Sequence, residues 1–451
     1  MSSSSGSPLD AVVRAEWPRI VASVLRITGD WDLAEDCAQD ATERALLTWP
    51  RDGVPDNTAA WLTSVARRRA LDVLRRRNTE SRALEEVAMT EPVATTFDAG
   101  SGYADDRLRL LFTCCHPDLT LQDRVALTLK TVSGLSTREV ARLLLVKEQT
   151  MSQRLLRVRE RIARSGLTLS VPPTDEIADR VASVLAVIYL VFTEGYSATE
   201  GAGVRDELAD EGVALAQLAT WLLPEHGEAH ALRALLLLQH ARRPARMTPT
   251  GELVPLEEQD RTRWDRPLIA AGLEALQLAR NAVADGDGSV GPYRVQAEIA
   301  ALHSTATLPG AVDWAAIVAW YDALLNATAS PVVAMNRVVA IGMRDGPDAG
   351  LIALEDAVDH HRLGEAPETS AIRADFLRRS GDINAAARAY REALAAARTS
   401  GVRMYLQRRL DELLDAMAQE AADPIDPEQN VIPLTDGRND DGSVRRTHLQ
   451  Q

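Results

Sequence analysis

The chain has 451 residues, a formal net charge of -15 and three cysteines, Cys37, Cys114 and Cys115. This length exceeds one ordinary hydrophobic core, so two or three domains are predicted. Two adjacent cysteines and one distant cysteine make no disulfide framework, and no stretch approaches about 18 consecutive apolar residues or resembles a secretory leader. These features exclude a small disulfide-rich secreted protein, predict no membrane partner and favour a cytoplasmic location.

The charge is unevenly distributed along the chain. Residues 1–165 contain 24 Lys and Arg against 23 Asp and Glu, whereas the remainder contains 26 against 42. A polyanion would therefore bind the first third. Few aromatic residues and abundant Ala, Leu and Arg predict an all-α fold.

Residues 9–49 predict two helices separated by a turn at 28–30. The second helix, Trp31 to Trp49, places polar side chains three or four residues apart on one face. These side chains are Asp36, Gln39, Asp40 and Glu43. Such spacing alone is typical of a solvated surface.

Residues 55–77 predict a helix that is both apolar and strongly basic. Its apolar stripe consists of Trp61, Leu62, Val65, Ala66, Ala70, Val73 and Leu74, and its arginines are Arg67, Arg68, Arg69, Arg75, Arg76 and Arg77. Asp72 is the single acidic residue among them. Guanidinium groups match phosphate, so the pattern indicates DNA binding. Trp61 either stacks on a base or packs in the core, and its spacing favours the core.

Periodicity fades over 78–103, as expected of a flexible tether. Short helices are predicted over 108–115 and 122–131, followed by a helix-turn-helix over 134–162. Ser136 or Thr137 caps its first helix, and Val140, Ala141 and Leu144 face inward. The second helix buries Met151, Leu155 and Val158 and leaves polar residues for solvent or DNA: Gln149, Ser152, Gln153, Arg154, Arg157, Arg159 and Arg161. An ordinary amphipathic helical hairpin is the alternative.

Pro172 and Pro173 indicate a boundary, after which helical patterns continue to residue 418. The predicted helices are 177–191, 208–223, 229–241, 268–284, 292–304, 314–326, 331–343 and 350–360. Gly381, Ala386, Tyr390 and Ala393 have the spacing of a tetratricopeptide repeat, so stacked helix pairs are expected. The tail from 419 is polar and predicted to be disordered.

The order of these motifs resembles bacterial extracytoplasmic-function (ECF) sigma factors, the initiation subunits of RNA polymerase. DLAEDCAQDATERAL resembles the polymerase-binding helix of sigma domain two, and PDNTAAWLTSVARRRALDVLRR resembles its DNA-melting loop and helix. GLSTREVARLLLVKEQTMSQRL resembles the promoter-reading part of domain four.

Five further segments resemble the subgroup of these sigma factors that carries a fused C-terminal, tetratricopeptide-like helical domain. They are LRLLFTCCHPDLTLQDRVALTLK (108–130), VIYLVFTEGY (187–196), GELVPLEEQDRTRWD (251–265), GPYRVQAEIAALH (291–303) and PVVAMNRVVAI (331–341). The resemblance implies regulation by this domain, with an unidentified protein or ligand as its partner. An acidic domain could shield the arginines by mimicking phosphate.

The resemblance also implies which residues bind polymerase and DNA. Asp36, Gln39, Asp40 and Glu43 would dock on the positively charged clamp of the RNA polymerase core. Asp56 and Asn57 would line a pocket for an unstacked base at the minus-ten element, and Arg67, Arg68, Arg75 and Arg76 would hold the backbone. Gln149, Ser152, Gln153, Arg154 and Arg157 would read the duplex minus-thirty-five element, with domain four against the polymerase flap.

Two residues depart from the wider superfamily, in which many members have Asn at Arg68 and Lys at Ser152. Both positions can touch DNA, so the promoter sequence that these relatives recognise cannot be assigned to this protein.

The implied boundaries are a disordered N-terminus (1–8), domain two (9–78), a linker (79–104), domain four (105–166), the C-terminal domain (176–418) and a tail (419–451).

Enzymatic alternatives find little support, and no enzyme activity or cofactor is predicted. Cys114, Cys115 and His116 suggest a metal or thiol site, but no further ligands follow at ordered spacing. The HGEAH segment, 226–230, lacks a Glu directly after its first His, and Pro224 and Glu225 predict a helix start there instead.

The remaining alternative is a helix-turn-helix regulator with a helical sensor domain that acts without core polymerase. It leaves residues 31–77 unexplained.

Overall fold

The computed structural model describes residues 8–84, 106–165, 169, 172–173, 175–196, 206–282, 290–361, 367–397 and 399–422. Within these ranges the regular elements are helices, and isolated bridge residues occur as well, among them the pair Met247 and Leu253. The all-α prediction is therefore confirmed. Most of the predicted linker and nearly all of the predicted tail lie outside the described residues.

The first three helices form an N-terminal module in which each helix packs on the other two. They are α1 (Pro8–Thr28), α2 (Trp31–Asp52) and α3 (Thr58–Leu84). Gly29, at φ +64°, turns the chain between α1 and α2, and the Asp30 carboxylate accepts a hydrogen bond from Leu33 N at 3.0 Å to cap α2. Helix α3 continues six residues past the predicted boundary at 78.

The next elements form the helix-turn-helix module. They are α4 (Asp106–Cys114), α5 (Leu121–Leu127), a π-helix η1 (Thr128–Val132), α6 (Thr137–Leu143) and α7 (Glu148–Ser165). Ser136 caps α6, because its hydroxyl accepts from Glu139 N at 3.2 Å while the Glu139 carboxylate accepts from Ser136 N at 2.8 Å. As predicted, Met151, Leu155 and Val158 of α7 are buried. Val140 and Ala141 of α6 are buried as predicted, and Leu144, which follows the last residue of the helix, is half-buried and packs against the core.

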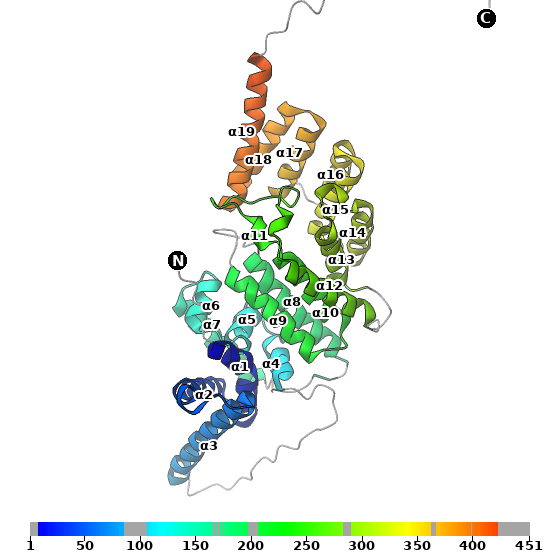
Figure 1. Cartoon of the computed structure of the whole chain (residues 1–451). Coiled ribbons are helices and arrows are strands. Elements are labelled where there is room, and N and C mark those ends of the chain that lie inside the picture. Colours follow the sequence, from blue (N-terminus) through cyan, green and yellow to red (C-terminus); the bar gives the residue numbers. More distant parts are fainter. Residues whose placement is uncertain are drawn as a thin grey trace, which may run out of the picture.

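The remaining helices form a C-terminal array that extends away from both modules (Figure 1). They are α8 (Ile177–Tyr196), α9 (Asp206–Leu222), α10 (Gly227–His240), α11 (Arg243–Arg246), η2 (Arg261–Arg263), α12 (Arg266–Asn281), α13 (Pro292–Thr305), η3 (Pro309–Ala311), α14 (Trp314–Thr328), α15 (Pro331–Asp345), α16 (Pro347–His361), α17 (Pro367–Ser380), α18 (Ile383–Ala396) and α19 (Ser400–Ala422). The predicted repeat corresponds to the packed pair α17 and α18. Gly381 turns the chain at φ +89°, and Ala386, Tyr390 and Ala393 are buried.

One hydrophobic cluster runs continuously from Trp17 to Leu236 and so includes both modules and the first helices of the array. Helix α1 packs on α4, and α4 and α5 pack on α8. Gly134, at φ +70°, lies against the Trp17 ring so closely that an added Cβ would come within 2.8 Å of it. The two modules are therefore packed together.

Candidate nucleic-acid and polymerase interface

The acidic side of α2 is a surface that we call the docking face. Asp36, Gln39 and Glu43 are exposed there, and Asp40 is half-buried with its carboxylate 3.1 Å from Arg44 Nε. Leu46 and Leu47 are also exposed farther along this helix. The sequence prediction named only the polar residues, although exposed leucines beside them add apolar area to a contact surface.

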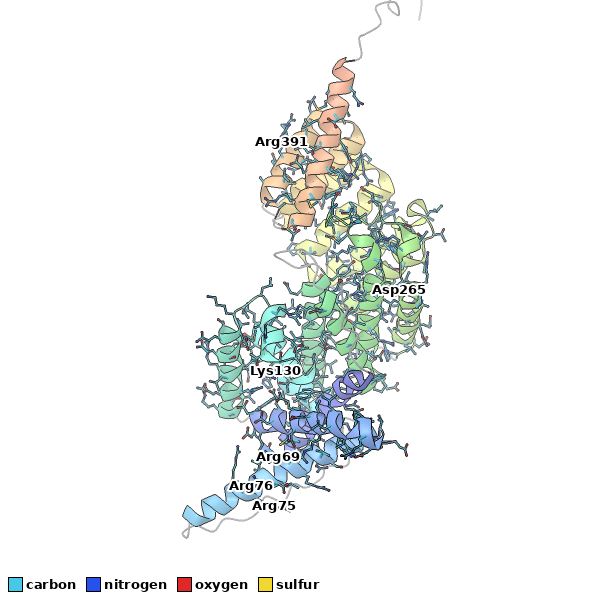
Figure 2. The ribbon with its side chains drawn as sticks, turned by 60° about the vertical axis from the view of Figure 1, so that its left-hand side comes forward. Arg69, Arg75, Arg76, Lys130, Asp265 and Arg391 are labelled. Carbon is cyan, nitrogen blue, oxygen red and sulfur yellow. The ribbon has the colours of Figure 1, made fainter. Side chains whose placement is uncertain are left out.

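The arginines of α3 lie along a helix that projects from the end of the molecule opposite α19 (Figures 1 and 2). Arg67, Arg68, Arg75 and Arg76 are exposed, as expected for phosphate contacts. Arg77 instead lies 3.1 Å from the Asp30 carboxylate and so ties α3 to the start of α2. The apolar stripe packs inward, with Leu62, Ala66 and Ala70 fully buried.

The loop before α3 presents Asp56 and Asn57, and both are exposed. The Asn57 side-chain oxygen accepts from Ala60 N at 2.9 Å, so this residue also caps the helix. Trp61 is half-buried and meets Trp49 edge to face at 5.4 Å between ring centroids. Its packing agrees with the core prediction.

The exposed side of α7 carries the predicted duplex-reading residues. Gln149, Ser152, Gln153 and Arg157 are exposed and Arg154 is half-buried. Arg157 Nε donates to the Gln153 carbonyl at 3.2 Å, within the helix. Arg142 of α6 forms an ion pair with Glu207 of α9, which links the helix-turn-helix directly to the array.

A group of charged residues, which we call the inter-domain ion cluster, joins the two modules. Glu35 of α2 is buried, and its Oε2 lies 3.1 Å from Lys130 Nζ of η1. Its Oε1 accepts from Arg159 Nη2 of α7 at 2.6 Å. Arg159 also pairs with Asp32, whose side chain is 73% exposed. Figure 2 shows Lys130 in the interior, away from the arginines of α3.

This cluster corrects one prediction and reveals a residue that the sequence analysis missed. Arg159 was predicted to face solvent or DNA, but it is held by two carboxylates of α2. Glu35 was not singled out, although its position among Leu33, Ala34, Cys37 and Ala38 on the apolar side of α2 was a visible signal. A carboxylate on an apolar helix face requires a cationic or hydrogen-bonding partner.

In the described part of the chain, the array does not lie over the arginines of α3. Helix α3 packs on α1 and α2, whereas α8 and α9 of the array pack on α4, and α8 also packs on α5. Arg75 and Arg76 lie far from α14–α19 (Figure 2). Shielding by the acidic array is therefore not seen at the arginines of α3, whereas Glu207 of the array does pair with Arg142 of the helix-turn-helix.

The cysteine and histidine segments have structural roles in the described region. Cys114 and Cys115 are buried, and burial raises the pKa of the Cys115 thiol to about 12, so it remains protonated at neutral pH. His116 Nδ1 accepts from Asp118 N at 3.1 Å, and His226 caps α10 as the helix-start prediction requires. Among the residues described, no group of three His, Cys, Asp or Glu side chains could hold a metal ion. None of the helices described combines the length and apolarity needed to cross a membrane.

Three family models match the chain, one each on the N-terminal module, the helix-turn-helix module and the first part of the array. The Sigma-70 region 2 model matches residues 12–80, and the Sigma-70, region 4 model matches 109–162. A model described as a family of unknown function (DUF6596) matches 180–280.

Curated relatives match both the whole chain and its sigma-like part. The uncharacterized protein R00370 of Rhizobium meliloti is 39% identical over 412 residues, which cover 90% of this chain and 96% of that protein. The probable ECF RNA polymerase sigma factor SigI of Mycobacterium tuberculosis, in two strains, is 28% identical over 174 residues. That match covers 38% of this chain and 59% of SigI. The chain therefore belongs to the family of R00370 and is a sigma-70-type protein, homologous to an ECF sigma factor and extended by a fused C-terminal helical domain.

Proposed function

We propose that the protein is an alternative sigma factor that binds the RNA polymerase core and directs promoter recognition, melting and transcription initiation. The observation that carries the proposal is the N-terminal module, which presents an acidic face on α2 and exposed arginines on α3. One surface suits a basic protein partner and the other suits DNA. A regulator that acts without core polymerase would not require an acidic protein-binding face beside a basic DNA-binding helix.

In this proposal the docking face binds the positively charged clamp. Asp36, Gln39, Asp40 and Glu43 supply complementary charge and hydrogen bonds, and Leu47 supplies exposed apolar area. Opposite charges across an interface speed association and fix its register.

Melting at the minus-ten element requires a base to leave the stack, at a cost of a few kcal/mol by analogy with base flipping. Asp56 and Asn57 would line a pocket for that base, and their exposure in the loop before α3 supports this role. Arg67, Arg68, Arg75 and Arg76 then hold the phosphates of the melted strand.

The helix-turn-helix would read the minus-thirty-five element through Gln149, Ser152, Gln153, Arg154 and Arg157, with the polymerase flap as its protein partner. Replacing both Arg154 and Arg157 by alanine should reduce promoter binding by the holoenzyme, since each bidentate contact to guanine contributes about 1 to 3 kcal/mol. Arg164→Ala is the matched control, because Arg164 is exposed on the last turn of the same helix. Gel-shift titrations should show the loss only in the double variant. An unaltered affinity and promoter preference would place readout elsewhere.

The packed arrangement has a consequence for regulation by the C-terminal domain. Two separate promoter elements can be bound together only if the two modules move apart, and the inter-domain ion cluster holds them together. The array packs on α4 and α5 of the helix-turn-helix module. We therefore infer that the array regulates the protein by stabilising or releasing this module.

Run-off transcription with purified core polymerase tests the proposal. The full chain added to core should yield defined transcripts from a promoter that core alone does not use. Promoter binding by the isolated protein without initiation by core would instead establish the helix-turn-helix regulator.

A further inference from the structure

The C-terminal array contains a cavity that polymerase and DNA binding leave unexplained. Its volume is about 600 Å³, within the range of small-molecule sites. A smaller chamber of about 140 Å³ adjoins it and shares Leu256, His303, Tyr321 and Asn336 with it. The cavity lies among α8, α10, α13, α14 and α15.

Four segments that the sequence analysis singled out meet at these two chambers. Segment 187–196 contributes Tyr189, and segment 291–303 contributes Gln296 and His303. Segment 251–265 contributes Leu256 and Arg261, and segment 331–341 contributes Asn336. Parts of the chain that are distant in sequence are thus assembled around one space.

The larger cavity has a positive charge without a carboxylate to balance it. Arg242 lines it, and the described lining of this larger cavity contains no Asp or Glu. Glu257 lines the smaller chamber, but its carboxylate is paired with Arg379 at 2.5 Å. Arg242 Nη2 donates to the Tyr196 hydroxyl at 2.7 Å, but its Nε is buried without a hydrogen-bond partner. Arg242 as a whole is half-buried, whereas nearby Arg261 is only 8% exposed and donates to the carbonyls of His303 and Ala306 at 2.6 and 2.8 Å. Among the described residues, neither arginine forms an ion pair with a carboxylate. Burying a cation without a counter-charge is costly, so an anion in the cavity would be stabilising.

The other polar groups around Arg242 are neutral. Burial, together with the charges of Arg242 and Arg261, lowers the pKa of His303 to about 4, so its imidazole is uncharged at pH 7. His303 Nδ1 is buried without a hydrogen-bond partner. Burial raises the pKa of Tyr321 to about 12, so its phenol is also neutral. These groups can hydrogen-bond a ligand without adding charge, while Leu238, Ile299 and Val333 provide apolar walls.

We propose that this cavity binds a small organic anion whose acidic group pairs with Arg242 and whose apolar body packs between α10, α13 and α15. Binding is independent of the proposed sigma function, and only its effect on transcription rests on that function. The proposal thereby names a class of ligand, small organic anions, for the C-terminal array.

The test measures binding to the full chain without polymerase or DNA. The probe is 1-anilinonaphthalene-8-sulfonate, an aromatic anion whose fluorescence rises in apolar surroundings. Saturable one-site binding is expected, with displacement by phenylacetate at least about tenfold stronger than by uncharged phenylacetamide. Absence of saturable binding, or equal displacement by the two competitors, would overturn the proposal.

Variants connect the binding to this cavity. Arg242→Gln should weaken probe affinity about 10- to 100-fold, because a hydrogen-bonded charge partner is lost. Arg263→Gln is the matched control, since Arg263 is exposed on the neighbouring η2, and it should bind as the wild type does. Ala300→Phe should block the cavity while retaining Arg242, so it tests the site even if Arg242→Gln does not fold. Wild-type affinity in a folded Arg242→Gln or Ala300→Phe variant would refute the assignment.

Discussion

Replacing Glu35 by alanine is expected to lower the free energy of unfolding by about 3 to 5 kcal/mol, because it leaves a buried cation without its partner. The Lys130 side chain is only 9% exposed, and its ammonium lies 3.1 Å from Glu35. Arg159 loses a 2.6 Å contact in the same substitution. Urea denaturation followed by circular dichroism measures the effect.

Asp32→Ala provides the matched control for this prediction. Asp32 pairs with the same Arg159, but its side chain is largely solvated, so its loss should cost only about 0 to 1 kcal/mol. Equal effects of the two substitutions would show that burial of the ion cluster does not stabilise the packing of the two modules.

Reversing the charge of the docking face is expected to cause the second large change, a loss of affinity for core polymerase. We expect Asp36→Lys with Glu43→Lys to weaken binding to core polymerase by roughly 100-fold or more, because like charges across an interface cost several kcal/mol. Both residues are exposed, so the fold should be unaffected. Asp40 is left unchanged because it pairs with Arg44 within α2.

The control for charge reversal is Asp348→Lys with Glu355→Lys, two exposed residues of α16 that undergo the same change in net charge. Pull-down and fluorescence titration with core polymerase should show loss only for the docking-face variant. Retained binding by that variant, with a native circular dichroism spectrum, would remove the docking face from the proposed interface.

The helices were predictable because their signals are local. Ser136 and Glu139 are three residues apart and form the reciprocal cap that starts α6. The buried residues of α7 follow from helical spacing alone. Leu144, just past the end of α6, also packs against the core as its spacing predicts, although it is only partly buried.

The inter-domain contacts were not predictable in the same way. Glu35 meets Lys130 and Arg159, which are distant in the chain, so no local pattern connects them. Arg159 therefore appeared to be one more cation available to DNA. Which arginines the acidic array covers was unpredictable for a related reason, because net charge gives the sign of a domain's charge but not which neighbour it contacts.

The continuous hydrophobic cluster from Trp17 to Leu236 also affects the order of events during synthesis. The N-terminal modules emerge from the ribosome first, yet their core is completed by residues of α8–α10, which are translated later. Helices α17–α19 instead bury a separate cluster around Tyr390. Helices α1–α7 are therefore synthesised before the residues of α8–α10 that close their shared core. During that interval the two modules are not yet packed by the array.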